Sequence, residues 1–361
     1  MGKPKARHKR IAVFLPNWVG DAVMATPALR ALREHFAGDR IAYVARAAAA
    51  ATLEGCPWAD EVIVDKSGST RSMMSGFFSL MFRLRRRRFH LAVLFPNSFR
   101  SALVARLGGV RKVIGYRRDG RGWLLSRSLG PPRNEAGLIP TSAIDYYNAL
   151  AAFAGATAES HRMELPVSQA VQEQADALLR EAGVCPGATL VMVNPGASFG
   201  TSKLWPPKRF AAVADALFER RGAAIIINAA PAERAIAAEV AAAMRNKPAV
   251  NFADRPNSIG LLKGLLRRCR LLITNDTGAR HIGAAVGAAV VTIFGSTDPD
   301  WTVIHYGRER QVRTTVDCAP CQKKTCPQPA GPHYHQCMDA ITPEQVLAAA
   351  EELLDMPEAR V

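Results

Sequence analysis

Short apolar runs alternate with longer amphipathic stretches along almost the whole chain. The runs are rich in Val, Ile, Leu and Ala, which is typical of buried parallel strands. In the first half they predict strands at 10–15, 40–44, 61–64, 90–95 and 112–115. Apolar positions with helical spacing predict helices at 22–36, 70–85, 98–107 and 143–153.

The second half repeats this alternation. Strands are predicted at 190–193, 223–228, 250–252, 271–274 and 289–294, and helices at 209–220, 232–245, 258–268 and 343–354. The segments 133–141 and 157–166 show neither pattern and are expected to be loops. Alternating strands and helices predict parallel sheets with helices on both faces. We therefore expect an α/β protein with two Rossmann-like βαβ domains, at residues 1–165 and 166–340, followed by a C-terminal helix at 341–361.

Polar residues follow two neighbouring apolar runs of the second half. After the run 271–273, the sequence Thr274-Asn-Asp-Thr-Gly278 offers helix-capping side chains and a glycine that lets a ligand approach the backbone. The run 289–294 ends in the same way at Gly295-Ser-Thr. Because a helix N-terminus has unpaired N–H groups and a partial positive charge, such turns suit phosphate. Two ordinary capped helices would explain the same residues, so both interpretations stay open.

The segment 191–206 is another strand that runs into a loop rich in glycine and hydroxyl residues. Lys203 lies just before the next predicted helix. Backbone N–H groups, the hydroxyl of Thr201 or Ser202, and the Lys203 ammonium would together suit a diphosphate. The GxxxxGK[ST] spacing of a Walker loop is absent. Near the N-terminus, the first strand leads into a turn that ends at Gly20-Asp21.

These segments resemble the motifs of family 9 glycosyltransferases, in order, from about residue 10 to about residue 350. The matching residues are Asn17-Trp-Val-Gly-Asp21, Pro96-Asn-Ser-Phe99, Asn194-Pro-Gly-Ala197 with Lys203 and Trp205-Pro206, and Thr274-Asn-Asp-Thr-Gly278 with His281. The resemblance implies the GT-B architecture, in which two Rossmann-like domains face each other across a cleft. The first domain would bind the acceptor and the second the nucleotide sugar.

Within this family, Trp18 and the segment 96–99 resemble members that add the second heptose of a lipopolysaccharide core more than members that add the first. The resemblance implies transfer of L-glycero-D-manno-heptose from ADP-heptose to the first heptose of the inner core (Kdo-lipid A carrying heptose), with inversion. Addition to a core without heptose, as by heptosyltransferase I, and another family 9 sugar transfer stay open. A non-catalytic anionic-glycolipid-binding protein would explain the charge of the chain, but not Asp21 and Lys203 together. A NAD-dependent oxidoreductase needs GxGxxG after the first strand, and residues 16–20 lack it.

Two residues match the chemistry of such a transfer, which deprotonates an acceptor hydroxyl and stabilises a leaving diphosphate. Asp21 matches the family's general base, although an Asp here could also cap the following helix. Lys203 is the candidate cation for the diphosphate, and the alternative is an ordinary surface lysine. No metal is expected to be required for catalysis, and Asp298-Pro-Asp300 is expected to be structural.

The other candidates are assigned to donor or acceptor binding. Because Asp276 would repel a diphosphate, it is expected to orient sugar hydroxyls. Glu233 matches a family acid that contacts the ribose, and for His281 a donor contact and a structural role stay open. The donor-binding candidates are Thr201, Ser202, Glu233, Asp276, Thr277, Gly278 and His281. The acceptor-binding candidates are Asn17, Trp18, Asn97, Ser98 and Arg100.

The charge of the chain points to an anionic partner. There are 47 Lys and Arg against 31 Asp and Glu, a formal charge of +16, and the densest cluster is at 83–88. A solvated helix face would explain one cluster, but the concentration of charge in the first half suits an anionic leaflet or glycolipid. No nucleic-acid-binding motif is found, so nucleic acid is not expected as a partner. No apolar run reaches the ~18–20 residues of a membrane span. We expect a cytoplasmic protein that is peripherally associated with the inner leaflet of the inner membrane.

Four of the seven cysteines cluster near the C-terminus, with the spacing C-x2-C-x4-C-x10-C. They are Cys318, Cys321, Cys326 and Cys337, and His333 and His335 lie among them. In a cytosolic protein this spacing favours a metal site over disulfides. The expected group is a structural zinc, with an iron–sulfur cluster as the alternative, and a loop without metal stays open. Cys56, Cys185 and Cys269 are expected to be small buried apolar residues.

Overall fold

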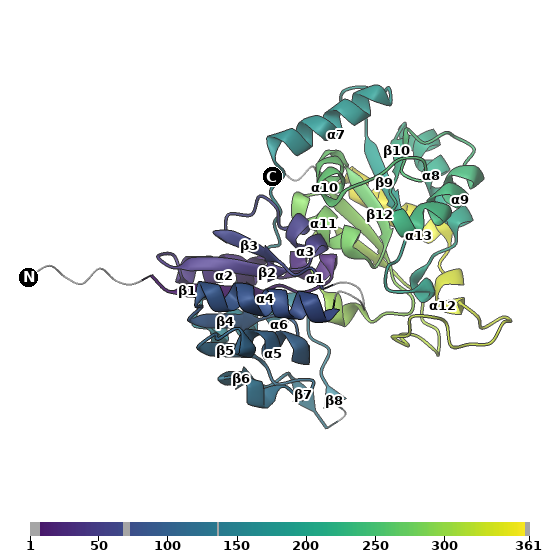
Figure 1. Ribbon diagram of the computed structural model, residues 1–361. Coiled ribbons are helices and arrows are strands. Elements are labelled where there is room, and N and C mark those ends of the chain that lie inside the picture. The colour runs from purple at the N-terminus through teal and green to yellow at the C-terminus, as the bar shows by residue number, and fades with distance from the viewer. Residues whose placement is uncertain (1–7, 68–72, 136, 358–361) are drawn as a thin grey trace, which may run out of the picture. The chain divides into compact units, whose positions relative to one another are not determined.

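The computed structural model describes residues 8–67, 73–135 and 137–357. The chain divides into two compact units, one of Met1–Met163 with Asp300–Ile304 and one of Glu164–Pro299 with His305–Val361. Each unit contains a six-stranded parallel sheet with helices on both faces (Figure 1). This arrangement confirms the predicted α/β class with two Rossmann-like βαβ domains.

The first sheet has the strand order β3-β2-β1-β4-β5-β6. Its strands are β1 (Arg10–Phe14), β2 (Arg40–Ala45), β3 (Glu61–Val64), β4 (Leu91–Leu94), β5 (Lys112–Tyr116) and β6 (Arg127–Leu129). The expected loop at 133–141 instead contains a short hairpin of β7 (Arg133–Asn134) and β8 (Gly137–Leu138). Strands β1 and β4 are neighbours although they are not consecutive in the chain. The strand order therefore reverses between them, which is where ligands bind in open α/β sheets.

The helices of the first unit are α1 (Val19–Met24), α2 (Thr26–His35), α3 (Ala47–Thr52), α4 (Met73–Arg87), α5 (Phe99–Leu107) and α6 (Ala143–Phe153). The helix predicted at 22–36 is divided into α1 and α2. Pro27 lacks an N–H, and the Thr26 hydroxyl donates to the carbonyl oxygen of Val23 at 2.7 Å, so the helical ladder is interrupted there. Residues 70–72 of the helix predicted at 70–85 lie outside the described residues.

The core of the first unit lies between its sheet and two helices. Phe14 and Leu94 of neighbouring strands share a buried cluster with Leu80 and Leu84 of α4 and with Ala102 of α5. Helices α4 and α5 therefore cover one face of the sheet (Figure 1), and α2 packs beside α6. The strands are held between two helical layers, so their carboxyl ends are left for the loops that carry polar residues.

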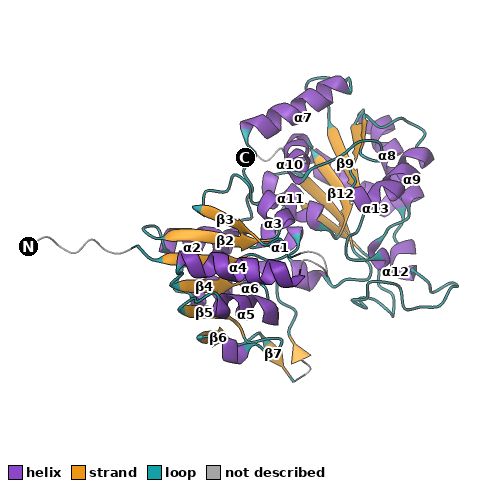
Figure 2. Cartoon of the chain, viewed as in Figure 1, coloured by secondary structure: helices purple, strands orange, loops and turns teal. Residues whose placement is uncertain are grey.

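The second sheet has the order β11-β10-β9-β12-β13-β14. Its strands are β9 (Leu190–Asn194), β10 (Ala224–Ile227), β11 (Val250–Asn251), β12 (Leu271–Asn275), β13 (Ala289–Ile293) and β14 (Glu309–Val312). Its helices are α7 (Gln169–Glu181), α8 (Pro207–Arg221), α9 (Arg234–Ala243), α10 (Ile259–Arg268), α11 (Gly278–Val286), α12 (Gln336–Asp339) and α13 (Pro343–Asp355). Figure 2 shows α7, α10 and α11 on one side of these strands and α8, α9 and α13 on the other.

Helix ends in the second unit follow local sequence rules. Ser258 and Thr342 accept backbone N–H groups as N-caps of α10 and α13, and Gly222 ends α8 with φ 60°. The turn after β12 begins α11, as expected. The turn after β13 leads only to the short 3-10 helix η4 (Pro299–Thr302). The interpretation of both turns as ordinary capped helices was therefore wrong for Gly295-Ser-Thr. Within the described residues, no helix is both long enough and apolar enough to span a membrane.

The isolated cysteines have different environments. Cys269 is buried and Cys56 is half-buried, but Cys185 is exposed. The expectation that Cys185 is buried was wrong, because Cys185 lies at an exposed position in the turn between α7 and β9.

Candidate functional site

The donor-binding candidates gather at the carboxyl edge of the second sheet. Strands β9 and β12 pair directly, with Ile273 opposite Val193 and Thr274 opposite Asn194, although strands β10 and β11 lie between them in the chain. The strand order reverses at this pair, so the loop 195–203 and the N-terminus of α11 both open at the switch point of the sheet. The predicted phosphate-binding segments therefore share one edge.

Asparagine side chains fix these two segments to each other. The amide nitrogen of Asn194 donates to the hydroxyls of Thr274 at 3.0 Å and Thr277 at 3.2 Å. The amide of Asn275 donates to the carbonyl oxygen of Pro195 at 2.8 Å. Thr277 is the N-cap residue of α11, but its hydroxyl makes no capping bond within that helix. The first N–H groups of α11 are therefore not satisfied by a side-chain cap, which suits an anionic ligand.

Lys203 is not a surface lysine. It ends the 3-10 helix η2 (Thr201–Lys203), and its side chain is only 11% exposed. Its Nζ donates to Oδ2 of Asp276 at 2.6 Å and to the Asp276 carbonyl oxygen at 3.0 Å, and it lies 4.8 Å from the centre of the Phe199 ring. The sequence predicted Lys203 as the cation for the leaving diphosphate and Asp276 as a donor-binding residue, and the fold brings the two into direct contact.

The carboxylate of Asp276 is held in its ionised form. Burial alone raises its pKa, but the charges of Lys203 and Arg280 outweigh burial and lower the pKa to about 2. Thr297 also donates to Oδ2 of Asp276 at 3.0 Å. The neighbouring His281 is buried, and burial lowers its pKa to about 3, so its imidazole is neutral at pH 7. Its Nδ1 is buried without a hydrogen-bond partner among the described residues.

Glu233 lies over the start of the donor loop. It ends the 3-10 helix η3 (Pro231–Glu233), where its carboxylate accepts from the Ala230 N–H at 3.2 Å and from the Ser198 hydroxyl at 3.5 Å. A side chain at Gly196 would collide with this carboxylate in its present position, so Glu233 would have to move to accommodate one. The loops after β9 and β10 thus meet at the place where the sequence predicts ribose binding.

Thr201 and Ser202 have different surroundings. Thr201 is exposed, whereas Ser202 is buried, with its hydroxyl 3.0 Å from the Ser296 hydroxyl and bonded to the carbonyl oxygen of Lys323. The Ser202 N–H donates to the carbonyl oxygen of Lys324 at 3.1 Å. The Cys-rich loop 318–337 therefore packs directly against the turn that carries Lys203.

The four clustered cysteines lie near one another within that loop. Burial, together with nearby Cys318, Cys321 and Cys326, raises the pKa of Cys337 to about 11. The backbone N–H of His335 lies 3.3 Å from the Cys326 sulfur. No three of the four sulfur atoms lie within 4.8 Å of one another in the described chain. The thiols are thus gathered but not closed around a common point.

In the first unit, the acceptor candidates follow β1 and β4 at its switch point. Asp21 lies in the first turn of α1 and is half-buried. Its carboxylate accepts a hydrogen bond from the hydroxyl of Tyr147, a buried residue of α6 whose pKa is raised by burial and by Asp21. Trp18 occupies the N-cap position of α1 and is 59% exposed, and Asn17 is also exposed. Asp21 is therefore not the N-cap of α1.

Asn97 is oriented by two donors. Its Oδ1 accepts from Tyr146 at 3.1 Å and from the buried Arg121 at 3.3 Å. Arg121 also donates to the carbonyl oxygens of Pro96 and Ser98 and so fixes this loop; burial lowers its pKa to about 10. Because the carbonyl side of the Asn97 amide is occupied, its NH₂ group is the side left to face a ligand.

Ser98 and Arg100 both have structural partners. Ser98 caps α5 by accepting from the Ser101 N–H at 3.3 Å. Arg100 pairs with Asp65 at 2.7 Å, and hydrogen bonds from Arg100 and Ser67 outweigh burial and lower the pKa of Asp65. An anionic acceptor group would have to compete with Asp65 for Arg100.

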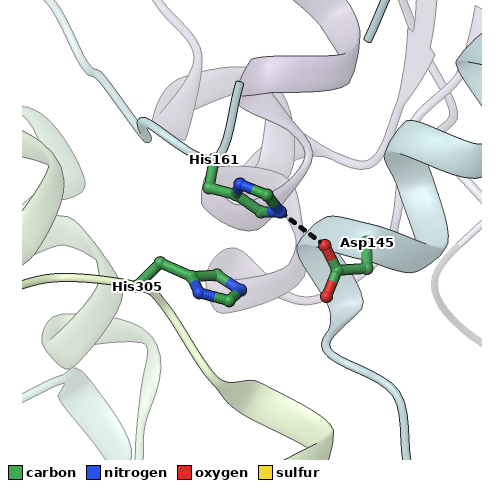
Figure 3. A group of neighbouring side chains, drawn as sticks. All are labelled: Asp145, His161 and His305. Atoms are coloured by element: carbon green, nitrogen blue, oxygen red, sulfur yellow. Dashed lines mark hydrogen bonds and ion pairs between the residues drawn. The ribbon is translucent and has the colours of Figure 1, made fainter. Parts of the chain in front are cut away.

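An ion pair between Asp145 of α6 and His161 lies outside the predicted site. His161 Nε2 lies 2.7 Å from Oδ1 of Asp145, and both side chains are 42% exposed. Figure 3 marks this contact with a dashed line. This pair connects α6 to the segment that links the two units and involves none of the candidate residues.

The chain matches the model of glycosyltransferase family 9 (heptosyltransferase) over residues 77–330. The chain belongs to this family. It is 26% identical to lipopolysaccharide heptosyltransferase 2 of Escherichia coli K12, over 97% of this chain and 100% of that protein. It is also 26% identical to lipooligosaccharide heptosyltransferase 2 of Campylobacter jejuni serotype O:2, over 96% and 98% of the two chains.

Solved structures confirm the GT-B type of fold for this family 9 glycosyltransferase. A family 9 glycosyl transferase from Veillonella parvula superposes with a TM-score of 0.81 at 24% identity, over 96% of this chain and 97% of that one. E. coli ADP-heptose lipopolysaccharide heptosyltransferase II superposes with a TM-score of 0.75 at 24% identity, over 96% and 98%.

Several residues of the glycosyltransferase's candidate site were missed by sequence reasoning. Tyr147 and Arg121 each hold a predicted residue or loop from another part of the chain, and no local motif marks them. Asn275 lies within a matched motif, but its bond to the carbonyl oxygen of Pro195 was not predicted. Arg280 did carry a signal, since it lies four residues after Asp276 on α11, where side chains meet.

Proposed function

We propose that this glycosyltransferase transfers heptose from ADP-L-glycero-D-manno-heptose to the first heptose of the lipopolysaccharide inner core, with inversion. The observation that carries the proposal is the buried pair of Lys203 and Asp276 beside the uncapped N-terminus of α11. A cation, aligned N–H groups and a hydroxyl-rich loop at one sheet edge suit the diphosphate of a nucleotide sugar. The full-length similarity to proteins named heptosyltransferase 2 supports the choice of sugar and acceptor.

The transfer forms one bond and breaks another at the anomeric carbon. The acceptor oxygen bonds to that carbon while the bond to the donor's phosphate oxygen breaks, and ADP leaves with both electrons of the broken bond. Asp21 takes the proton of the acceptor hydroxyl, and its bond from Tyr147 keeps the carboxylate oriented. Lys203 and the N–H groups of α11 stabilise the charge on the leaving diphosphate.

Polar groups around these two residues orient the substrates. Asp276 and Glu233 accept hydrogen bonds from sugar and ribose hydroxyls, respectively, and Asn97 donates through its NH₂ group to the acceptor. Trp18 provides an exposed aromatic face that a sugar ring can cover.

Turnover with two acceptors tests this proposal. Purified protein is given ADP-heptose and either a core without heptose or a core with a single heptose, and released ADP is measured. Release only with the second acceptor is the expected result. Release only with the first would assign the reaction of heptosyltransferase I, and release with neither would overturn the donor or acceptor.

A structural metal at the Cys-rich loop is a separate proposal. Four thiols and His335, whose Nε2 is buried without a hydrogen-bond partner among the described residues, form a donor set that suits zinc. Zinc would hold the loop 318–337 as a clip, and the loop in turn supports the turn of Lys203 through Ser202. No step of the transfer passes through this metal.

Peripheral contact with an anionic membrane is supported by helix α4. Met74, Phe78 and Phe82 are 63%, 45% and 57% exposed and lie four residues apart, so they share one face. Arg85 and Arg86 follow on the same helix and are also exposed. An apolar stripe beside exposed arginines is the composition of a helix that lies in the interface of an anionic bilayer. We infer that α4 brings the protein to the membrane that holds its acceptor.

A further inference from the structure

Arg280 is a buried cation that the proposed reaction does not use. Its side chain is 0% exposed, and it grips Glu309 with two bonds, from Nε to Oε1 at 2.6 Å and from Nη2 to Oε2 at 3.0 Å. Its third nitrogen, Nη1, lies 3.4 Å from Oδ1 of Asp276. The guanidinium lies over the Phe294 ring at 5.0 Å, and Thr292 donates to Glu309 at 2.6 Å. The position of Arg280 is therefore determined from three sides.

Lys203, Asp276, Arg280 and Glu309 form a buried quartet of two cations and two anions. Their side chains are 11%, 6%, 0% and 6% exposed, in that order. The two cations contact different oxygens of Asp276, Lys203 at Oδ2 and Arg280 at Oδ1. Lys203 lies at the more exposed end, toward the donor loop, and the bidentate pair lies at the interior end.

This arrangement matters because the Lys203 ammonium cannot pair fully with both the Asp276 carboxylate and a diphosphate at the same time. A buried carboxylate that loses its counter-charge is costly, so breaking one partner of a buried ion pair is strongly destabilising. If Lys203 turns toward a ligand, Asp276 keeps a cation only through Arg280. The two hydrogen bonds from Arg280 to Glu309 hold the planar guanidinium in position for that contact.

We propose that Arg280, anchored by Glu309, is a positioning residue that keeps Asp276 paired when Lys203 turns to the diphosphate of the donor. The inference rests on the proposed role of Lys203. It requires that Arg280 act on diphosphate binding through Lys203, without touching the ligand. Replacing Arg280 should therefore weaken binding of a ligand that has a diphosphate and leave binding of its nucleoside part unchanged.

The test uses the double variant R280M/E309Q, which removes both charges of the interior pair and nearly keeps their volume. Binding of ADP and of adenosine to the full chain is measured by calorimetry. The expected result is an ADP affinity lower by about tenfold, with adenosine unchanged. The matched control is R268M/D176N, which removes another ion pair of the second unit, at 2.5 Å, that involves no donor candidate. This control should bind ADP as the original protein does.

A second arm shows whether the effect passes through Lys203. In a K203M background, adding R280M/E309Q should change ADP affinity by less than about twofold, because no lysine remains to be released. Equal losses in both backgrounds, a parallel loss of adenosine binding, or no loss at all would each overturn the positioning role. If the original protein and K203M bind ADP equally, the proposed function of Lys203 fails instead.

Discussion

Asp21 is held in place by residues that the sequence does not put near it. Tyr147 lies on α6, more than a hundred positions along the chain, and is fixed by burial and by stacking on Phe95 at 5.1 Å. A carboxylate oriented by a rigid phenol can keep one oxygen toward the acceptor, as a general base requires. Asp21 lies in the first turn of α1, after the N-cap residue Trp18, and α1 has no side-chain capping bond at its N-terminus.

Replacing Asp21 by Asn is expected to lower turnover by about 10²–10⁴-fold, because the amide cannot accept the proton of the acceptor hydroxyl. ADP affinity should stay unchanged, since Asp21 belongs to the first unit. The measurement is ADP release at saturating donor, alongside calorimetric binding of ADP. D119N is the matched control, as Asp119 is an exposed carboxylate in a turn of the same unit. Turnover of D21N within a few-fold of the original protein would remove Asp21 as the base.

At the scale of elements, the Cys-rich loop 318–337 packs against the turn that carries Lys203 and supports it. Carbonyl oxygens of Lys323 and Lys324 accept from the hydroxyl and N–H of Ser202, and Gly200 has no side chain because one would collide with Lys324. Long loops without secondary structure are ordered only at an entropic cost, and a metal clip reduces that cost. A bound zinc would therefore hold the turn that carries Lys203.

The loop is expected to bind about one zinc per chain, and C318S/C321S should lose it. The thermal midpoint and ADP affinity should both fall in this variant because the turn at Ser202 loses its support. Metal content by elemental analysis and the thermal transition are the measurements. The control is C185S, which changes an exposed cysteine outside the loop and should alter neither. Metal-free protein with an unchanged transition after incubation with zinc would contradict the clip.

The elements that the sequence could predict are those with an uninterrupted apolar pattern. The buried runs identified β1 to β5 and β9 to β13, and with them the strand ends where the loops open. Helix α7 and strand β14 were missed because polar residues dominate both. Strand β14 has the sequence Glu309-Arg-Gln-Val312, with a single apolar residue. The break before Pro27 did have a local signal, since proline at the start of a new helix is common.

The candidate site also has parts that local sequence could predict and parts that it could not. Turns that belong to one strand end, such as Thr274–Gly278 and the loop with Lys203, could be found from local composition. The contact between Lys203 and Asp276 could not, because it depends on β9 lying next to β12 in the sheet. The pair of Arg280 with Glu309 depends likewise on β14 pairing with β13 at the sheet edge. Local sequence identifies the groups, and strand order decides which of them meet.

At the scale of the whole molecule, the charge of +16 is divided between structural and exposed arginines. In the cluster at 83–88, Arg83 donates to the carbonyl oxygen of Val64 at 2.7 Å and Arg87 pairs with Glu61 at 3.0 Å. Arg85 and Arg86 remain exposed beside the apolar stripe of α4. Membrane attraction is worth about 1 kcal/mol per basic residue near an anionic surface. Only the exposed part of the cluster can therefore contribute to membrane contact.

Binding to vesicles separates the apolar and the charged contributions of α4. F78S/F82S should lose most binding to phosphatidylethanolamine–phosphatidylglycerol vesicles, because two aromatic side chains no longer enter the interface. R85E/R86E should bind weakly as well, and its residual binding should depend less on salt, since fewer charges are left to be screened. F218S removes an exposed phenylalanine of α8, 43% exposed, and should bind as the original protein does. Because α4 contains none of the candidate site residues, turnover of a soluble, delipidated acceptor should stay unchanged in every variant. Co-sedimentation of F78S/F82S equal to that of the original protein would show that α4 is not the membrane-facing surface.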